Sequence, residues 1–306
     1  MGFGRMSASA WDDFTASTTA GKSTAHVFTA RGMKDNLNPS MFEFRESCDS
    51  VDNPNSTAIG IFLDVTGSMG MIPDYMAREG MKPLFTEIYD RKPVSDPHIM
   101  FGAIGDVRCD RSPLQVSQFE ANIVLAEQLV DFYLEGGGGG NSWESYNLPW
   151  FLAATRTKID CMIKRKKKGY LFTIGDEETP DNLTVSDLQR VFGPGQYTAL
   201  TNEQLLEMVR QSYHVFHVVV EEGSHCRGSN ADRVVAGWHK LLGQNVLRLS
   251  NYKKLAEVIV SAIQITEGES HNVVVDSWDK TTALVVARAT NGLMATNKTD
   301  SALVSF

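Results

Sequence analysis

The chain has few cysteines and no long apolar segment. Its four cysteines lie more than fifty residues apart, at Cys48, Cys109, Cys161 and Cys226. This spacing contains no CxxC pair and does not suggest a disulfide scaffold, so a reducing compartment fits best. No apolar run approaches the roughly 18 to 20 residues that a membrane-spanning helix needs, since even VFHVVV is interrupted by His217. The first residues also lack the charged-then-apolar pattern of a signal peptide, so we expect a cytoplasmic protein that does not enter a membrane.

Basic residues are fewer than acidic ones. The 306 residues include 29 Lys and Arg against 37 Asp and Glu, a formal net charge of −8. Such a surplus repels phosphate backbones and anionic lipids unless a local patch dominates, so nucleic acid is not expected as a partner. One basic run, KRKKK at 164–168, precedes an apolar segment. We interpret it as a solvated helix end, because the C-terminus of a helix favours cations.

Apolar residues are present in the proportion that a globular protein needs, 42% of the chain. From residue 57, short apolar runs alternate with longer stretches of helical periodicity, which is the α/β pattern. The runs are AIGIFLDV from 58, HIMFGAIGDV from 98, YLFTIGD from 170, HVFHVVV from 214 and NVLRL from 245. They predict a Rossmann-like, mostly parallel central sheet with helices on both faces. LQVSQF, from residue 114, is expected to add one antiparallel edge strand.

Composition divides the chain into three parts. The first 25 residues are mostly Ser, Thr, Ala and Gly, so residues 1–56 are predicted to form a flexible arm, with edge strands at 26–31 and 41–47. Residues 57–267 are predicted to form the α/β domain. Residues 268–306 form a tail in which 278–289 favours one more helix and 302–306 a terminal strand.

Polar side chains follow the first predicted strand at the point where it ends. Asp64, Thr66 and Ser68 stand there, directly before a helix. In an open α/β sheet, ligands bind outside the carboxyl ends of the strands. Carboxylate and hydroxyl oxygens at this spacing suit Mg²⁺ or Mn²⁺. We expect Thr66 and Ser68 to ligate the ion directly and Asp64 to accept hydrogen bonds from bound water.

Two further segments are predicted to reach the same edge. Five consecutive glycines at 136–140 lead into Asn141 and Ser142, and a glycine loop lets the backbone pass close to an ion. Asp176 follows the strand predicted from residue 170. The predicted ligand set is therefore Asp64, Thr66, Ser68, Asp176 and one of Asn141 or Ser142.

Three more acidic residues stand close to these segments. Glu144 and Glu177 are expected either to support the ligands or to be solvated, and the sequence does not decide between these alternatives. Asp106 ends a strand that should lie beside the first, and it is expected to make structural hydrogen bonds.

These residues resemble the von Willebrand factor A (vWA) domain family. The metal-ion-dependent adhesion site (MIDAS) of that family uses an Asp-x-Ser-x-Ser loop, a Thr from a second loop and an Asp after a later strand. Asp64, Thr66 and Ser68 match the first loop, with Thr in place of the middle Ser, and Asp176 matches the late Asp. The second loop departs from the pattern, because Asn141 or Ser142 stands where the family has Thr. The resemblance covers about residues 57–267 and is greatest to intracellular bacterial and phage members.

The resemblance implies a non-catalytic protein-binding module. An ion held by few carboxylates and mostly neutral donors keeps positive charge and an open position, which an Asp or Glu of a protein partner can complete. Intracellular members resemble adaptors for AAA+ ATPases, so a separate AAA+ ATPase is one partner that the resemblance suggests.

Two alternatives stay open at this point. Haloacid-dehalogenase-like phosphohydrolases also place a Mg²⁺-binding Asp at the end of the first strand, and residues 175–181, GDEETPD, resemble their late acidic element. A lysine from 164–168 would then bind phosphate. That family has a second Asp two residues after the first, however, and this chain has Thr66 there. The other alternative is a metal-free structural or virion-associated scaffold.

Overall fold

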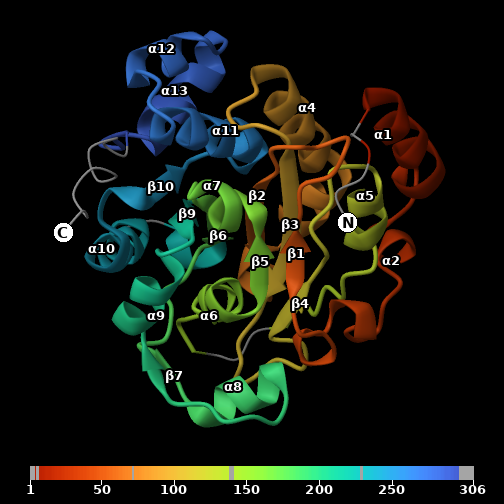
Figure 1. Cartoon of the computed structure of the whole chain (residues 1–306), viewed down its shortest axis with the longest axis vertical. Helices are drawn as coiled ribbons and strands as arrows, with labels where there is room; N and C mark the ends of the chain where they lie inside the picture. The colour runs from red at the N-terminus through yellow and green to blue at the C-terminus, as the bar shows by residue number, and fades with distance from the viewer. Residues whose placement is uncertain (1–3, 5–6, 71, 138–140, 228–229, 296–306) are drawn as a thin grey trace.

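A six-stranded sheet lies at the centre of the computed structural model, which describes residues 4, 7–70, 72–137, 141–227 and 230–295 (Figure 1). The strand order is β10-β9-β6-β2-β3-β4. The strands are β2 Thr57–Asp64, β3 Pro97–Ile104, β4 Leu114–Val116, β6 Gly169–Gly175, β9 Tyr213–Val220 and β10 Val246–Leu249. Five are parallel and β4 pairs antiparallel with β3. The predicted α/β fold class is therefore confirmed, including its antiparallel edge strand.

Helices cover both faces of this sheet and bury two apolar clusters against it. The first face is covered chiefly by α3 Ile72–Tyr75, α4 Met81–Arg91, α5 Val124–Leu129, α11 Leu255–Thr266, α12 His271–Asp276 and α13 Lys280–Ala289. The second face is covered by α6 Leu148–Thr155, α7 Asp160–Arg165, α8 Val185–Phe192, α9 Asn202–Val209 and α10 Asn230–Leu242. Strands β3 and β6 are buried along their whole length, as their mostly apolar sequences predicted, and their polar residues His98 and Thr173 are buried as well.

Short elements complete the described chain. Two small sheets pair β1 Arg45–Ser47 with β5 Thr157–Ile159, and β7 Asn182–Leu183 with β8 Leu200–Thr201. The 3₁₀ and π-helical turns are η1 Thr15–Thr19, η2 Asp35–Leu37, η3 Pro39–Met41, η4 Gly67–Met69, η5 Met76–Gly80, η6 Ser224–Cys226, η7 Gly243–Asn245 and η8 Tyr252–Lys254. Within the described ranges, none of the helices combines the length and the apolar character that crossing a bilayer requires.

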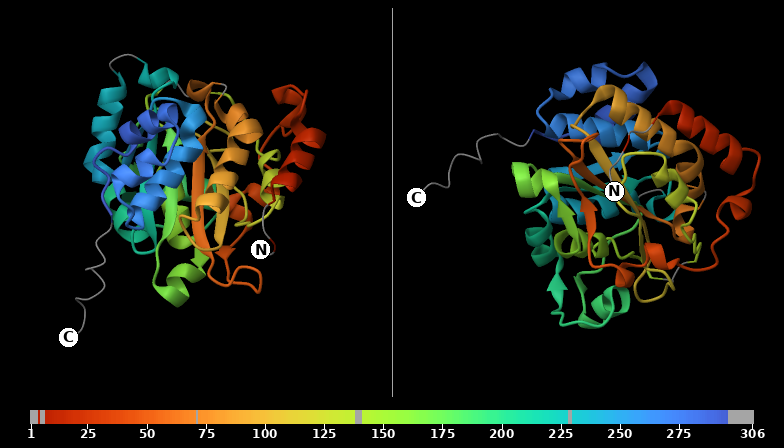
Figure 2. Two further views of the ribbon diagram at one scale, coloured as in Figure 1. Left: turned by 90° about the horizontal axis from the view of Figure 1, so that it is seen from above. Right: turned by 45° about the vertical axis from the view of Figure 1, so that its right-hand side comes forward.

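The amino-terminal segment differs from the flexible arm that its composition predicted. Helix α1 Ala8–Phe14 continues into η1, and the views in Figure 2 show α1 lying alongside α4. Trp11 is 2% exposed, and its ring centroid lies 5.5 Å from that of Phe85 in α4. One large aromatic side chain thus supplies the apolar contact that the surrounding Ser, Thr and Ala residues lack.

The edge strands predicted in this segment are largely wrong. Residues Thr24–Val27 form helix α2, so the alternation seen at 26–31 does not mark a strand. A short strand, β1, does form within 41–47, but it pairs in parallel with β5 and makes no hairpin. A pattern of period two over six residues is too short to exclude a helical turn.

The carboxyl-terminal segment packs on the sheet domain. The helix expected at 278–289 is confirmed as α13, and α12 precedes it. Val274, Val286 and Leu293 are buried in the same apolar cluster as α11. The strand expected at 302–306 lies outside the described residues.

Candidate metal centre

Three neighbouring strands end at one edge of the sheet and direct polar residues to it. Asp64 is the last residue of β2, and Asp176 follows β6 directly. Asp106 comes two residues after β3. Because β2 pairs in parallel with both β3 and β6, their carboxyl ends lie side by side. The expected convergence of distant segments at this edge is therefore present.

Four of the residues that the sequence singled out form one hydrogen-bonded chain. The Thr66 hydroxyl donates to Asp64 Oδ1 over 2.6 Å and lies 3.2 Å from the Ser68 hydroxyl. Ser68 Oγ in turn donates to Asp176 Oδ1 over 2.7 Å. Since both hydroxyl hydrogens are directed at carboxylates, each hydroxyl oxygen keeps lone pairs for another ligand. This arrangement places two neutral oxygen donors between two acidic groups.

Asp64 is held by a residue that the sequence reasoning missed. Its side chain is fully buried, and Oδ2 accepts a 2.6 Å hydrogen bond from the Tyr146 hydroxyl, while Oδ1 also accepts from the backbone N–H of Thr66 over 2.8 Å. Tyr146 reaches this position because Gly175 has no side chain: a Cβ there would lie 1.9 Å from the Tyr146 hydroxyl oxygen. No single-sequence pattern marks a contact between residues 146 and 175.

Asp176 is fixed from the opposite side by a fourth segment. Its Oδ2 accepts a hydrogen bond of 2.8 Å from the backbone N–H of His225, in η6. Gly223 passes so close to Asp176 that a Cβ on this glycine would lie 2.3 Å from the aspartate Cβ. Asp176 is itself fully buried, so its carboxylate has one defined orientation at the strand end.

The glycine-rich loop contributes less directly than the sequence suggested. Its described part contacts the first loop, because the Gly67 N–H donates to the Gly137 carbonyl over 2.6 Å; residues 138–140 lie outside the described chain. Asn141 Nδ2 donates to Asp106 Oδ2 over 2.6 Å, whereas Ser142 is exposed. Asn141 therefore contacts the acidic residues through its hydrogen bond to Asp106. Asp106 makes structural hydrogen bonds, as expected, and also accepts one from the backbone N–H of Arg108.

Glu144 and Glu177 are not solvated. Their exposed fractions are 2% and 4%, and the Oε2 atom of each is buried without a hydrogen-bond partner. Glu177 Oε1 lies 2.9 Å from His225 Nδ1. A buried carboxylate oxygen without a donor is costly unless a cation or a proton accompanies it.

Five buried acidic residues form what we call the carboxylate cluster: Asp64, Asp106, Glu144, Asp176 and Glu177. Burial, reinforced by the negative charge of the neighbouring carboxylates, raises the pKa of Glu144 to about 10, of Glu177 to about 8 and of Asp64 to about 7. Among the described residues, no Lys or Arg makes a salt bridge with any of the five. Apart from the His225 imidazole beside Glu177, the described chain places no basic side chain within salt-bridge distance of this cluster, and a bound metal ion would relieve the repulsion among its carboxylates.

The chemistry of the donors limits which ion could bind. Within the described residues, no group of three or more His, Cys, Asp or Glu side chains is arranged to hold a metal by itself. A metal at this edge would have to use the hydroxyls of Thr66 and Ser68 together with the carboxylates. Such an all-oxygen set suits a hard cation such as Mg²⁺ or Mn²⁺ rather than a thiolate- or imidazole-bound metal.

An aromatic layer supports the cluster from the second face of the sheet. The ring of His217 stacks on Trp238 at a centroid distance of 3.6 Å, and Tyr146 packs edge-on against both. Trp238 Nε1 donates to the Glu177 carbonyl over 2.9 Å. This packing fixes the ring of Tyr146 and, through its hydroxyl, the carboxylate of Asp64.

The lysines of 164–168 lie at the other end of the sheet. They precede β6, whereas Asp176 follows it, and a strand of this length separates its two ends by about 20 Å. The phosphate-binding role that the phosphohydrolase alternative gave to one of these lysines is therefore wrong for a site at Asp64.

Comparisons with known proteins found distant structural similarity only. No family model matches the chain, and no curated protein sequence matches it. Two crystal structures of the pilus adhesin SpaC from Lactobacillus rhamnosus GG are similar to 71% of this chain, at 10% identity and a TM-score of 0.45. Proximal thread matrix protein 1 from the mussel byssus is similar to 72% of it, at 10% identity and a TM-score of 0.42. The chain spans 31% and 32% of the two adhesin chains and 48% of the mussel protein, and similarity at this level carries no argument about function.

Proposed function

We propose that this protein is a vWA-type, non-catalytic module that binds a protein partner through a divalent metal ion at a MIDAS-like site. The ion is Mg²⁺ or Mn²⁺, and the partner contributes an Asp or Glu. The observation that carries the proposal is the carboxylate cluster, in which buried negative charge meets no Lys or Arg of the described chain. The hydroxyls of Thr66 and Ser68 lie 3.2 Å apart between Asp64 and Asp176, two carboxylates of this cluster.

Each residue of the site has a distinct task in this proposal. Thr66 and Ser68 offer hydroxyl oxygens as ligands, while Asp64 and Asp176 orient those hydroxyls by accepting their hydrogen bonds. Tyr146 holds Asp64 in turn. The remaining protein ligand is assigned to Asn141 or Ser142.

A bound Mg²⁺ would present an open coordination position to the partner's carboxylate. Such a contact is a charge-assisted interaction in a partly dry site, and losing one buried partner of that kind typically costs about 2 to 5 kcal/mol of binding. A separate AAA+ ATPase remains one partner that the vWA resemblance suggests.

Metal binding is the first test, measured by calorimetric titration of Mg²⁺ and Mn²⁺ into the purified protein. We expect Ser68→Ala to weaken binding about tenfold or more, because it removes one ligand oxygen and the donor to Asp176. Ser186→Ala is the matched control, since it deletes an identical hydroxyl from an exposed side chain of α8 that belongs to no proposed ligand set. Loss of binding in Ser142→Ala with none in Ser68→Ala would show that the ligand set is assigned to the wrong loop.

Partner capture is the second test. Proteins retained by the wild type in Mg²⁺, but lost in EDTA and with Ser68→Ala, would support metal-mediated binding. An unchanged set of partners in all three conditions would contradict it and would favour the metal-free scaffold. Hydrolysis of an aryl phosphate by the wild type, abolished by Asp64→Ala, would favour the phosphohydrolase instead.

A further inference from the structure

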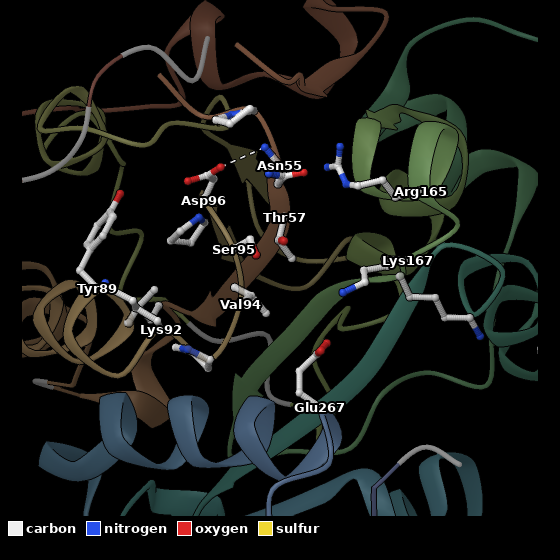
Figure 3. Close-up of a pocket in the computed structure, with 15 residues that line it drawn as sticks. Asn55, Thr57, Tyr89, Lys92, Val94, Ser95, Asp96, Arg165, Lys167 and Glu267 are labelled. Atoms are coloured by element: carbon white, nitrogen blue, oxygen red, sulfur yellow. Dashed lines mark hydrogen bonds between the residues drawn. The ribbon is translucent and has the colours of Figure 1, made fainter. Parts of the chain in front are cut away.

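A large cavity opens at the amino ends of the strands, opposite the candidate metal centre. Its volume is about 580 Å³, and β2 and β3 begin in its wall at Thr57 and Pro97 (Figure 3). Helices α4, α7 and α11 all end beside it. Nothing in the proposed metal-dependent function uses this end of the molecule.

Four cationic side chains and two carboxylates line this cavity, in a protein whose overall charge is −8. The cations are Lys92, Arg165, Lys167 and Lys168. Figure 3 shows Lys92 on one side of the cavity and Arg165 and Lys167 on the other. A local surplus of positive charge on an acidic protein is the condition under which an anion is attracted to one place on its surface.

The arginine is already occupied, whereas the lysines are not. Arg165 binds both carboxylate oxygens of Asp49, over 2.7 and 3.0 Å, and donates to the Ser56 carbonyl over 2.6 Å. Among the described residues, no carboxylate lies within salt-bridge distance of Lys92, Lys167 or Lys168. The cations free to meet a ligand are therefore all ammonium groups.

The two carboxylates of the cavity already have donors. Glu267 accepts a hydrogen bond of 2.5 Å from the Tyr170 hydroxyl, and Asp96 accepts one of 2.9 Å from the backbone N–H of Asn55. They lower the net positive charge of the cavity without pairing with its lysines.

Several ammonium groups around one cavity favour an anion that carries more than one charge. Arg pairs with carboxylates and phosphates alike, and Lys acts as a compact point charge. A phosphoryl group carries about two negative charges and several acceptor oxygens, so it can meet more than one ammonium group, whereas a carboxylate carries a single charge. The free cations of this cavity, being lysines on facing walls, thus fit a phosphoryl group better than a carboxylate.

The size of the cavity indicates more than inorganic phosphate. Small-molecule sites typically enclose about 300 to 1,000 Å³ and combine apolar walls with a few polar groups. Tyr89, Pro93 and Val94 line the same space as the lysines. The Tyr89 hydroxyl is engaged by the Ala121 carbonyl at 2.8 Å, which fixes the ring against the wall. We propose that this cavity binds a phosphorylated small molecule, with its phosphoryl group on the lysines and its organic part against Tyr89, Pro93 and Val94.

Stabilisation of helix ends is the competing explanation for the lysines. Lys92 and Lys166 both cap a helix C-terminus in the left-handed conformation, where a cation interacts favourably with the helix dipole. Lys166 does not line the cavity, and its Nζ lies 3.4 Å from the Ile163 carbonyl of its own helix. It therefore provides a matched control that shares the capping role without the cavity.

The test is calorimetric titration of the full chain with ADP and with inorganic pyrophosphate, in EDTA so that no metal ion mediates binding. We expect ADP to bind with a Kd below about 1 mM and more tightly than pyrophosphate. Lys92→Gln and the double variant Lys167→Gln/Lys168→Gln should each weaken binding about tenfold, since each removes charge-assisted contacts. Lys166→Gln should leave the Kd within about twofold.

Several results would overturn the proposal. Binding of neither probe, or equally tight binding of citrate, would exclude a phosphoryl-selective site. An equal loss of affinity in Lys166→Gln and Lys92→Gln would show that only the general charge of the surface matters. Because all four lysines are exposed, these variants are expected to fold, and thermal unfolding of each verifies it.

Discussion

The two ends of strand β2 hold charge in opposite ways. At the carboxyl end, Asp64 is fully buried within the carboxylate cluster. At the amino end, Thr57 borders a cavity whose lysines are exposed. Buried charges of one sign raise the free energy of the fold unless a counter-charge or a proton joins them, whereas exposed charges remain solvated. A cation at the carboxyl end would therefore stabilise the protein itself, while an anion at the amino end would matter chiefly for binding.

Gly175→Ala is expected to have the largest effect, because it disturbs the tight packing at the carboxyl ends of the strands. The added Cβ would lie 1.9 Å from the Tyr146 hydroxyl oxygen, so Tyr146 must move and release Asp64. We expect the free energy of unfolding to fall by about 3 kcal/mol, measured by urea denaturation. Gly32→Ala, where no atom lies within 4 Å of the new Cβ, should change it by less than about 0.5 kcal/mol. Equal stability of the two variants would mean that the site is not tightly packed.

The pH dependence of stability distinguishes the two ends without mutation. The pKa values of Asp64, Glu177 and Glu144 are raised in the folded protein, to about 7, about 8 and about 10. A raised pKa contributes stability below the unfolded value, and that stability is lost as the pH rises through the folded value. In EDTA, the free energy of unfolding and with it Tm should therefore fall as the pH rises from about 5 to about 8.

Added Mg²⁺ should reverse this fall, because it would stabilise the ionised cluster and bind the folded state only. The stabilisation should be larger at pH 8 than at pH 5. A Tm in EDTA that stays constant or rises over this range would contradict the assignment of buried, uncompensated carboxylates.

Glu144→Gln replaces one ionisable group of the cluster while keeping the shape of the side chain. Because the pKa of Glu144 is raised to about 10, the folded metal-free protein must keep this carboxyl protonated at pH 8, whereas the amide of Gln needs no proton. The unfolding free energy of the metal-free protein at pH 8 should therefore rise by about 1 to 3 kcal/mol. The same change should weaken Mg²⁺ binding, as less negative charge faces the ion. Destabilisation at pH 8 in EDTA would show that Glu144 has a protein partner in solution.

The smallest effect is expected at the amino end. Lys167→Gln removes an exposed charge that makes no salt bridge within the described chain, so the unfolding free energy should change by less than about 0.5 kcal/mol. A loss above about 1 kcal/mol in urea denaturation would indicate that the lysine is structural, and the contrast between the two ends would then weaken.

The sequence predicted those features that depend on local patterns. The five apolar runs form the five parallel strands. The rule that ligands bind at the carboxyl ends of strands predicted correctly that Asp64, Thr66, Ser68 and Asp176 lie close together. Both inferences use residues close in sequence or the general geometry of parallel sheets.

Features that depend on a single tertiary contact were not predictable. The role of Tyr146 requires the missing side chain of Gly175, and the order of the amino-terminal segment rests on Trp11 meeting Phe85. The burial of Glu144 likewise depends on how its loop packs on other strands. The cavity could not be predicted either, since it forms where separate helices end. The basic run at 164–168 was interpreted as a solvated helix end or, in the phosphohydrolase alternative, as a source of a phosphate-binding lysine at the other end of the sheet.

Strand length also varies across the sheet, from its middle to its margins. The outermost strands, β4 and β10, have three and four residues, whereas the inner four have seven or eight. A short edge strand exposes few unpaired backbone N–H and C=O groups to a neighbouring molecule. Two copies of this protein that collide in a crowded solution thus have little backbone on which to extend one another's sheet, and lateral polymerisation through β-pairing is disfavoured by the architecture itself.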